Sequence, residues 1–254
     1  MAVHELYLLP NGVLSLPRSR VIYGETSDER LLTPVYSVLL RTDDGDILFD
    51  TGIDPDAAWD PRALEGVTRN LHSFTEEDDV RSRLRDAGTT ENDVRIVIAS
   101  HFHYDHIGGL RYFRNAKVYV QNNELRAARH PDMGMDRVLR KQYFDHPLDF
   151  ETVMGDTEIA PGVWVLSTYG HTPGHQSLLV ELPDSGTMIF SGDAIHVWEN
   201  AEKERPFNGF YNLQDAYESI RRLKMLAAVT KGALVPSHDP ALWGTYKPAP
   251  YRYT

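Results

Sequence analysis

The sequence of 254 residues contains no cysteine, which excludes disulfide bridges and thiolate metal ligands. It also lacks an apolar stretch long enough to cross a bilayer, and its N-terminus has no basic and apolar leader. Basic residues are in the minority, because 26 Lys and Arg stand against 37 Asp and Glu. The resulting net charge of −11 argues against a nucleic-acid-binding surface. These absences predict a cytoplasmic protein that binds neither membranes nor nucleic acids.

The composition is that of an ordinary globular protein, and we expect residues 1–254 to form a single α/β domain. Short apolar runs predict strands at 5–9, 35–41, 46–50, 95–99, 117–121, 162–167, 177–181, 187–191 and 233–236. Helices are predicted at 76–87, 123–129 and 212–229, of which the last has the clearest amphipathic spacing. Segment 13–33 is expected to be loop or edge structure, and segments 53–75 and 130–155 are expected to be irregular excursions.

The most informative stretch is His101-Phe-His103-Tyr-Asp105-His106, which directly follows the predicted strand 95–99. On an extended backbone His101 and His103 point to the same side, and the turn that follows can bring Asp105 and His106 to the same cavity. Imidazole nitrogens with a carboxylate oxygen form a ligand set that suits Zn²⁺ and, less well, Fe, Mn or Co. The alternative is an ordinary polar loop, but this motif directly after a buried strand is typical of a metal site.

Three further predicted strands each end within a few residues of a possible metal ligand: His171 follows 162–167, Asp193 follows 187–191, and His238 follows 233–236. Folds of the α/β class place their ligands at the carboxyl ends of strands. We therefore expect these three side chains to meet the histidines of the first stretch at one site.

Together, H-x-H-x-D-H, Gly-His171-Thr-Pro-Gly-His175, Gly192-Asp193 and Ser237-His238 resemble the metallo-β-lactamase superfamily over nearly the whole chain. Within it, the spacing and the N-terminal half look most like N-acyl-homoserine lactonases. The resemblance implies a four-layer αββα sandwich, in which two mixed sheets pack face to face and helices cover the outside. It also implies a small-molecule lactone as substrate and a chain that is a monomer or a homodimer.

The resemblance further implies two metal ions, expected to be Zn²⁺, with Fe, Mn or Co as alternatives. The implied ligands fall into two groups with a shared bridge: His101, His103 and His171 for one ion, Asp105, His106 and His238 for the other, and Asp193 between them. Two ions about 3.5–4 Å apart share a hydroxide that would attack the lactone carbonyl. The implied activity is that of a metal-dependent lactonase that degrades quorum signals, with Asp105 and Asp193 as its catalytic carboxylates.

One position departs from the lactonase pattern. Such enzymes commonly carry a tyrosine three residues after the bridging aspartate, where it contacts the substrate carbonyl, and this chain has His196 there. Because an imidazole can donate a hydrogen bond or a proton, we expect His196 to bind substrate and take part in catalysis; the alternative is that it packs under its loop. Trp198 and Phe207 are expected to line the substrate pocket. Asp50 is expected either to orient a ligand histidine or to form a simple turn.

Other functions stay open beside the lactonase: hydrolysis of a different lactone, hydrolysis of a thioester as in glyoxalase II, or binding of a lactone without catalysis. The thioesterases add helices after their last histidine ligand, and only sixteen residues follow His238. A binding protein needs no complete two-metal ligand set. Apolar residues of the two excursions either line an acyl groove or pack these segments onto the domain; they include Trp59, Leu64, Met133 and Met135.

Overall fold

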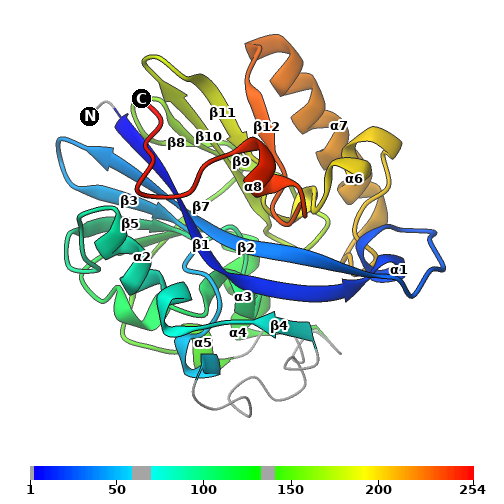
Figure 1. Ribbon diagram of the computed structural model, residues 1–254, viewed down its shortest axis with the longest axis horizontal. Coiled ribbons are helices and arrows are strands. Elements are labelled where there is room, and N and C mark those ends of the chain that lie inside the picture. Colours follow the sequence, from blue (N-terminus) through cyan, green and yellow to red (C-terminus); the bar gives the residue numbers. More distant parts are fainter. Residues whose placement is uncertain (1–2, 59–69, 133–140) are drawn as a thin grey trace.

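The computed structural model describes residues 3–58, 70–132 and 141–254, and their strands form two sheets (Figure 1). The strands of the larger sheet are β1 Val3–Pro17, β2 Arg30–Thr42, β3 Asp46–Phe49, β4 Leu71–Ser73, β5 Val94–Ile98, β6 Lys117–Gln121 and β7 Asp149–Val153. Those of the smaller sheet are β8 Thr157–Ala160, β9 Val163–Ser167, β10 Gln176–Leu182, β11 Gly186–Phe190 and β12 Ala233–Val235. The strand orders are β4-β1-β2-β3-β5-β6-β7 and β12-β11-β10-β9-β8.

The described α-helices are α1 Arg18–Val21, α2 Val80–Asp86, α3 Tyr104–Ile107, α4 Asn122–Arg129, α5 Lys141–Phe144, α6 Trp198–Lys203, α7 Leu213–Thr230 and α8 Leu242–Thr245. The helix α7 begins where the Asn212 side chain accepts hydrogen bonds from the amides of Gln214 and Asp215, and it ends before Lys231 in the left-handed conformation. Among the described residues, no helix combines the length and the apolar character that crossing a membrane requires.

Strand direction brings the loops of the site together. In the larger sheet β3, β5, β6 and β7 run parallel, so their carboxyl ends lie at one edge. In the smaller sheet β11 and β12 are parallel as well. The two sheets are tied where these ends meet, because the Gln176 amide at the start of β10 donates to the Ser100 carbonyl after β5 at 2.9 Å. The loops after β5, β9, β11 and β12 are thus gathered at a common edge.

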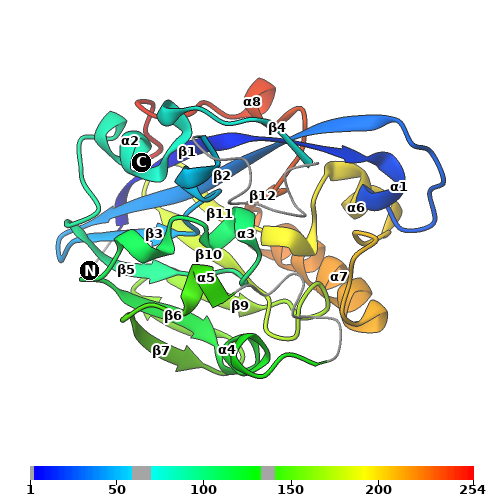
Figure 2. The same ribbon diagram turned by 90° about the horizontal axis from the view of Figure 1, so that it is seen from below.

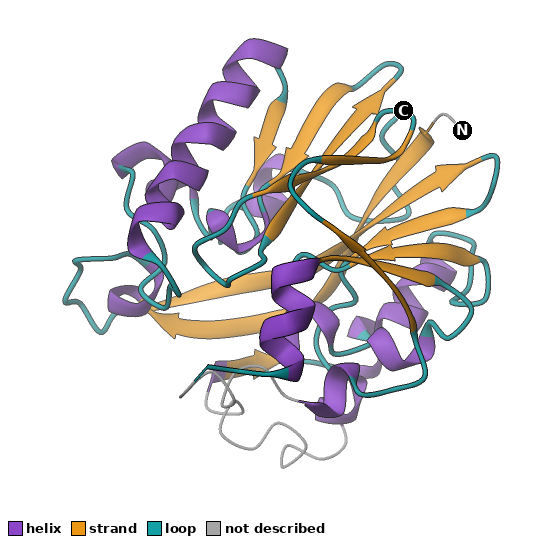
Figure 3. Cartoon of the chain, turned by 180° about the vertical axis from the view of Figure 1, so that it is seen from behind, coloured by secondary structure: helices purple, strands orange, loops and turns teal. Residues whose placement is uncertain are grey.

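The core consists of three apolar layers. Between the sheets, side chains such as Leu8 and Ile98 meet Val165 and Phe190. On the outer face of the larger sheet, apolar side chains pack against α2, α3, α4 and α5, which lie along that face in Figure 2. On the outer face of the smaller sheet, apolar side chains pack against α7, the long helix of Figure 3. The four-layer αββα sandwich of mixed sheets is confirmed.

Three of the predictions on loops and helix starts need correction. Segment 13–33, expected to be loop or edge structure, is strand at both ends, because β1 continues to Pro17 and pairs with β2 from Arg30 onward. Segment 130–155 contains α5 and the edge strand β7, whose mainly polar residues hid it in the sequence. Of the helix expected at 76–87, Glu76–Asp78 form a 3-10 turn and the α-helix begins at Val80, where the Asp79 side chain accepts from the Arg81 amide and caps it.

Candidate metal centre

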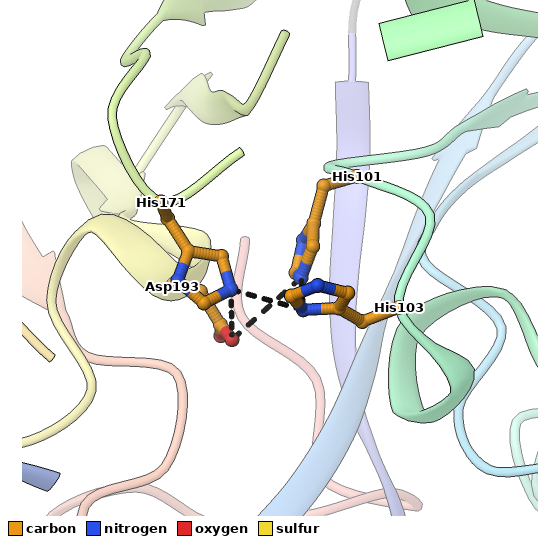
Figure 4. Close-up of side chains that lie close together, drawn as sticks. All are labelled: His101, His103, His171 and Asp193. Carbon is orange, nitrogen blue, oxygen red and sulfur yellow. Dashed lines mark hydrogen bonds and ion pairs between the residues drawn. The ribbon is translucent and has the colours of Figure 1, made fainter. Parts of the chain in front are cut away.

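The first group of ligand atoms comes from three loops. His101 and His103 follow β5, His171 lies in the loop between β9 and β10, and Asp193 follows β11. Their ligand atoms all lie within 4.8 Å of one another (Figure 4). His103 Nδ1 is 2.9 Å from His101 Nε2 and 3.0 Å from His171 Nε2. Asp193 Oδ2 lies 3.2 Å from His171 Nε2 and 3.7 Å from His101 Nε2.

The second group is formed by Asp105 and His106 in α3 and by His238 after β12. Asp105 Oδ2 is 3.8 Å from His106 Nε2 and 3.7 Å from His238 Nε2. The other oxygen of Asp193 faces this group, because Asp193 Oδ1 lies 3.2 Å from His106 Nε2 and 3.1 Å from His238 Nε2. One carboxylate therefore presents an oxygen to each group, which is the arrangement that a bridging ligand requires.

The donor set fits two divalent transition-metal ions. Five imidazoles and two carboxylates converge in a buried space, where isolated polar groups are costly. His106 Nε2 is buried and makes no hydrogen bond, although it points at the carboxylates. Nitrogen and carboxylate donors of this kind suit Zn²⁺ and its neighbours. The cluster thus supports a dimetal centre.

Two histidine rings form a hydrogen bond through the nitrogen that points away from the metal centre, and this bond fixes which nitrogen faces the centre. His238 Nδ1 donates to the Pro34 carbonyl at 2.8 Å, and His106 Nδ1 donates to Asp50 Oδ2 at 2.7 Å, so both Nε2 atoms keep a lone pair for a metal. Asp50 thus contacts a histidine of the cluster, as the first of its two expected roles requires. By contrast, both nitrogens of His175 are engaged: Nδ1 donates to the Thr168 carbonyl, and Nε2 accepts from the Asp193 amide at 2.8 Å.

The loop that carries Asp193 needs glycine before it. Gly192 has a positive φ of 50°, and a Cβ there would meet His175 Nε2 at 2.7 Å. This conformation aims the Asp193 carboxylate between the two ligand groups, while Ser237 Oγ donates to its Oδ1 at 2.9 Å.

The two groups differ in charge before any ion binds. Burial and the neighbouring imidazoles hold the pKa of His101 and of His103 well below its usual value, so both rings are neutral. Burial acts the same way on His106, but the facing carboxylates, that of Asp193 first, raise its pKa well above the usual value. Burial also opposes ionisation of Asp193, yet the imidazoles around it, His196 first, keep its pKa well below that of an ordinary aspartate.

His196 lies beside the centre, with its side chain 2% exposed. Its Nε2 is 3.2 Å from Asp193 Oδ2, and its Nδ1 makes no hydrogen bond. The ring stacks on Phe207, with centroids 3.9 Å apart and planes 3° from parallel. Phe207 also lines a small cavity next to His171 and Asp193. Trp198 begins α6 and is 37% exposed, so its ring is at the surface rather than among the buried ligands.

The structure thus brings together the seven expected ligands, with His196 and Phe207 against them. Trp59, Leu64, Met133 and Met135 lie outside the described residues. Glu124, a buried carboxylate that binds the ligand loops, was missed. In the sequence it is one acidic residue in the first turn of a predicted helix, and such a residue is usually a solvent-exposed partner of the helix dipole.

Comparisons with known proteins agree with this geometry. The pattern of the metallo-beta-lactamase superfamily matches residues 30–238. An N-acyl homoserine lactonase from a Bacillus sp is 38% identical over 243 residues, or 94% of each chain. N-acyl homoserine lactonase AiiA of Bacillus thuringiensis subsp. kurstaki is 37% identical over 243 residues, with the same coverage.

Solved structures give the same result. A mutant of B. thuringiensis AiiA with N-decanoyl-L-homoserine bound at its active site matches with a TM-score of 0.88 and 35% identity, covering 100% of both chains. An N-acyl homoserine lactone hydrolase with the product N-hexanoyl-L-homoserine at its catalytic metal center matches with the same values. This chain belongs to the metallo-beta-lactamase superfamily.

Proposed function

We propose that this chain opens the ring of N-acyl homoserine lactones by hydrolysis at a dimetal centre. The observation that carries the proposal is Asp193, which presents one oxygen to each ligand group. The similarity to N-acyl homoserine lactonases over 94% of the chain supports the substrate class. When bound, a pair of divalent ions supplies a hydroxide at neutral pH and polarises the substrate carbonyl.

The carboxylates of the chain take two roles in this proposal. Asp193 holds the two ligand groups at a fixed spacing, so that a lactone carbonyl is placed against both. Asp105 lies in the second ligand group, with Oδ2 3.7 Å from His238 Nε2, and we assign it to pass a proton to the ring oxygen as that oxygen leaves. Neither role requires a nucleophilic side chain.

His196 takes the place of the usual tyrosine as a hydrogen-bond donor to the substrate. Burial lowers its pKa to about 4, so the ring is neutral at pH 7 and donates through an N–H group rather than as an imidazolium. Stacking on Phe207 restricts the plane of the ring. Phe207 and Trp198 are assigned to the pocket wall, with Trp198 at its outer rim because its side chain is exposed.

The proposal also covers the metal, the cellular location, the oligomeric state and the biological role. We assign Zn²⁺ as the metal because three nitrogen donors meet in one group, with Fe, Mn or Co as alternatives. We place the protein in the cytoplasm, as a monomer or homodimer without a nucleic-acid partner, on the basis of its acidic charge and lack of cysteine. Its role there is the degradation of quorum signals.

A hydrolysis screen with a pH indicator tests the proposal. Metal-loaded protein is offered acyl-homoserine lactones of several chain lengths, a simple γ-lactone, an aromatic-fused lactone, a thioester and a β-lactam. We expect the acyl-homoserine lactones to be hydrolysed fastest, and the Asp193→Asn protein to be nearly inactive on all of them. If the thioester or another lactone were hydrolysed faster, that compound class would be the substrate instead of the acyl-homoserine lactones. Tight stoichiometric binding of lactone without turnover would identify a binding protein.

A further inference from the structure

Glu124 lies in the first turn of α4 and is a fully buried carboxylate, with 0% exposure. Its two oxygens accept three hydrogen bonds. Oε1 accepts from the Phe102 amide at 2.9 Å, and Oε2 accepts from Thr172 Oγ1 at 2.7 Å and from the Gly174 amide at 2.9 Å. A buried carboxylate with three donors is strongly held, because hydrogen bonds to an ionised acceptor are the stronger kind.

The three donors flank the ligands of the first group. Phe102 is the residue between His101 and His103, and Thr172 directly follows His171. One side chain therefore binds both loops that carry this group, although 22 and 50 residues separate it from the two amides along the chain. Neither oxygen forms a hydrogen bond to an imidazole, so Glu124 holds the rings of this group through the position of their loops.

Packing leaves these loops little room to adjust around Glu124. A Cβ added to Gly174 would lie 2.2 Å from the Glu124 amide nitrogen, so the loop sits directly on α4. The Phe102 ring is buried and stacks on Phe144, with centroids 5.3 Å apart. The His171 loop has a second anchor, because the Tyr211 amide donates to the Gly170 carbonyl at 2.7 Å. Loss of Glu124 is thus expected to shift the loops without releasing them.

We propose that Glu124 is a positioning residue of the first metal group: it fixes the separation of the His101–His103 loop and the His171 loop, and thereby sets the metal affinity of that group alone. The second group does not depend on this carboxylate, because its rings are oriented by Asp50 and by the Pro34 carbonyl. Partners that orient metal ligands from outside commonly contribute about 10–100-fold in affinity.

The test uses proteins that retain one group each. His238→Ala disables the second group, and His103→Ala disables the first. In each background, the Zn²⁺ affinity of the protein with Glu124→Gln is compared with that of the protein that keeps Glu124. The affinity is measured by competition with a chromophoric chelator. Glutamine offers only one acceptor oxygen, and its NH₂ group faces an N–H donor, so at least one loop loses its anchor. We expect Zn²⁺ affinity to fall about 10–100-fold in the His238→Ala background and to stay within about twofold in the His103→Ala background.

A matched pair of threonine variants separates positioning from general loss of stability. Thr172→Val removes a hydroxyl from Glu124, and Thr89→Val removes a hydroxyl from Asp46, a bond of 2.6 Å at the start of β3. We expect Thr172→Val to weaken Zn²⁺ binding in the His238→Ala background and Thr89→Val to leave it unchanged. The melting temperature of each metal-free protein is measured alongside.

Equal weakening of both groups by Glu124→Gln, or no weakening of either, would overturn the proposal. So would a Thr89→Val protein that loses as much metal affinity as Thr172→Val. Because the readout is the affinity for Zn²⁺, the result does not depend on which lactone, if any, the protein hydrolyses.

Discussion

The first and second ligand groups are oriented through different parts of the chain. In the second group, outer partners bind the rings themselves: His106 Nδ1 donates to Asp50, and His238 Nδ1 donates to the Pro34 carbonyl. In the first group, His101 Nδ1 contacts only the Ser100 hydroxyl, at 2.9 Å, and His171 Nδ1 makes no hydrogen bond. The rings of the first group therefore depend on the position of their loops, and the rings of the second group depend on direct hydrogen bonds.

This difference matters because the two groups share Asp193. A ring held by a carboxylate keeps its direction when its loop moves slightly, whereas a ring held by its backbone moves with the loop. A variant of the bridging residue should therefore affect both metal sites, a variant next to one group should affect that site, and a variant remote from both should affect neither.

The largest effect is expected for Asp193→Asn, because it removes the element common to both groups. The amide cannot present a negative oxygen to each side, so one ion should bind weakly and activity should fall with it. We expect kcat to drop on the order of 10²–10³-fold, the loss typical of removing one strong electrostatic contributor to a transition state. Elemental analysis after mild dialysis, set beside turnover, measures both quantities. Two retained ions and full activity would mean that Asp193 is not a bridge.

Asp50→Asn is the counterpart of Glu124→Gln for the second group. The amide keeps one acceptor oxygen, but it cannot serve both Ser100 and His106 as the carboxylate does. We expect Zn²⁺ affinity to fall about 10–100-fold in the His103→Ala background and to fall less in the His238→Ala background, because Asp50 reaches His101 only through the Ser100 hydroxyl. If the two single-group proteins lost affinity equally, the separation of the groups would be wrong.

His196→Phe should leave both groups loaded and lower turnover only. Removal of one hydrogen-bond donor commonly costs about 10²–10³-fold, and the metal ions already polarise the carbonyl, so a loss of about 10–100-fold in kcat is expected. His196→Tyr should recover much of it, because the phenol is an equivalent donor. Measured kcat, metal content and melting temperature decide the matter. Near-normal turnover of His196→Phe, or parallel loss of stability and activity, would assign His196 to packing.

The smallest effect is expected for Asp156→Asn, which touches neither group. Burial opposes ionisation of Asp156, but its bonds to Arg222 and Ser167 lower its pKa below the ordinary value. Its contribution is therefore complete above its unfolded pKa and is lost as the pH falls through the lower folded value. The Asp156 side chain is 37% exposed, so we expect less than about 1 kcal/mol at pH 7. Denaturant titrations at pH 7 and near pH 3 should differ less for the variant than for the parent, while its Zn²⁺ affinity stays unchanged.

The cluster of candidate ligands could be predicted from the sequence because each of its loops follows a short apolar strand, and strand ends lie together in this class of fold. The edge strand β7 could not, because its residues, Asp149 to Val153, are mostly exposed and show no apolar alternation. The extension of β1 to Pro17 was hidden for a different reason: Pro10-Asn11-Gly12 predicts a turn, but the strand shifts register there and continues to the buried Leu14 and Leu16. Glu124 could not be predicted because its donors are distant in sequence and only the folded loops bring them to it.

Hydrolysis of N-hexanoyl-homoserine lactone in ¹⁸O-labelled water tests the proposed activity most directly. The metal-loaded protein should produce the ring-opened acid over many turnovers, with one label per molecule in the carboxylate, because water attacks the carbonyl carbon. The Asp193→Asn protein, loaded in the same way, should release little labelled acid. Label in the hydroxyl group instead, or binding of the lactone without any labelled acid, would contradict hydrolysis at the dimetal centre.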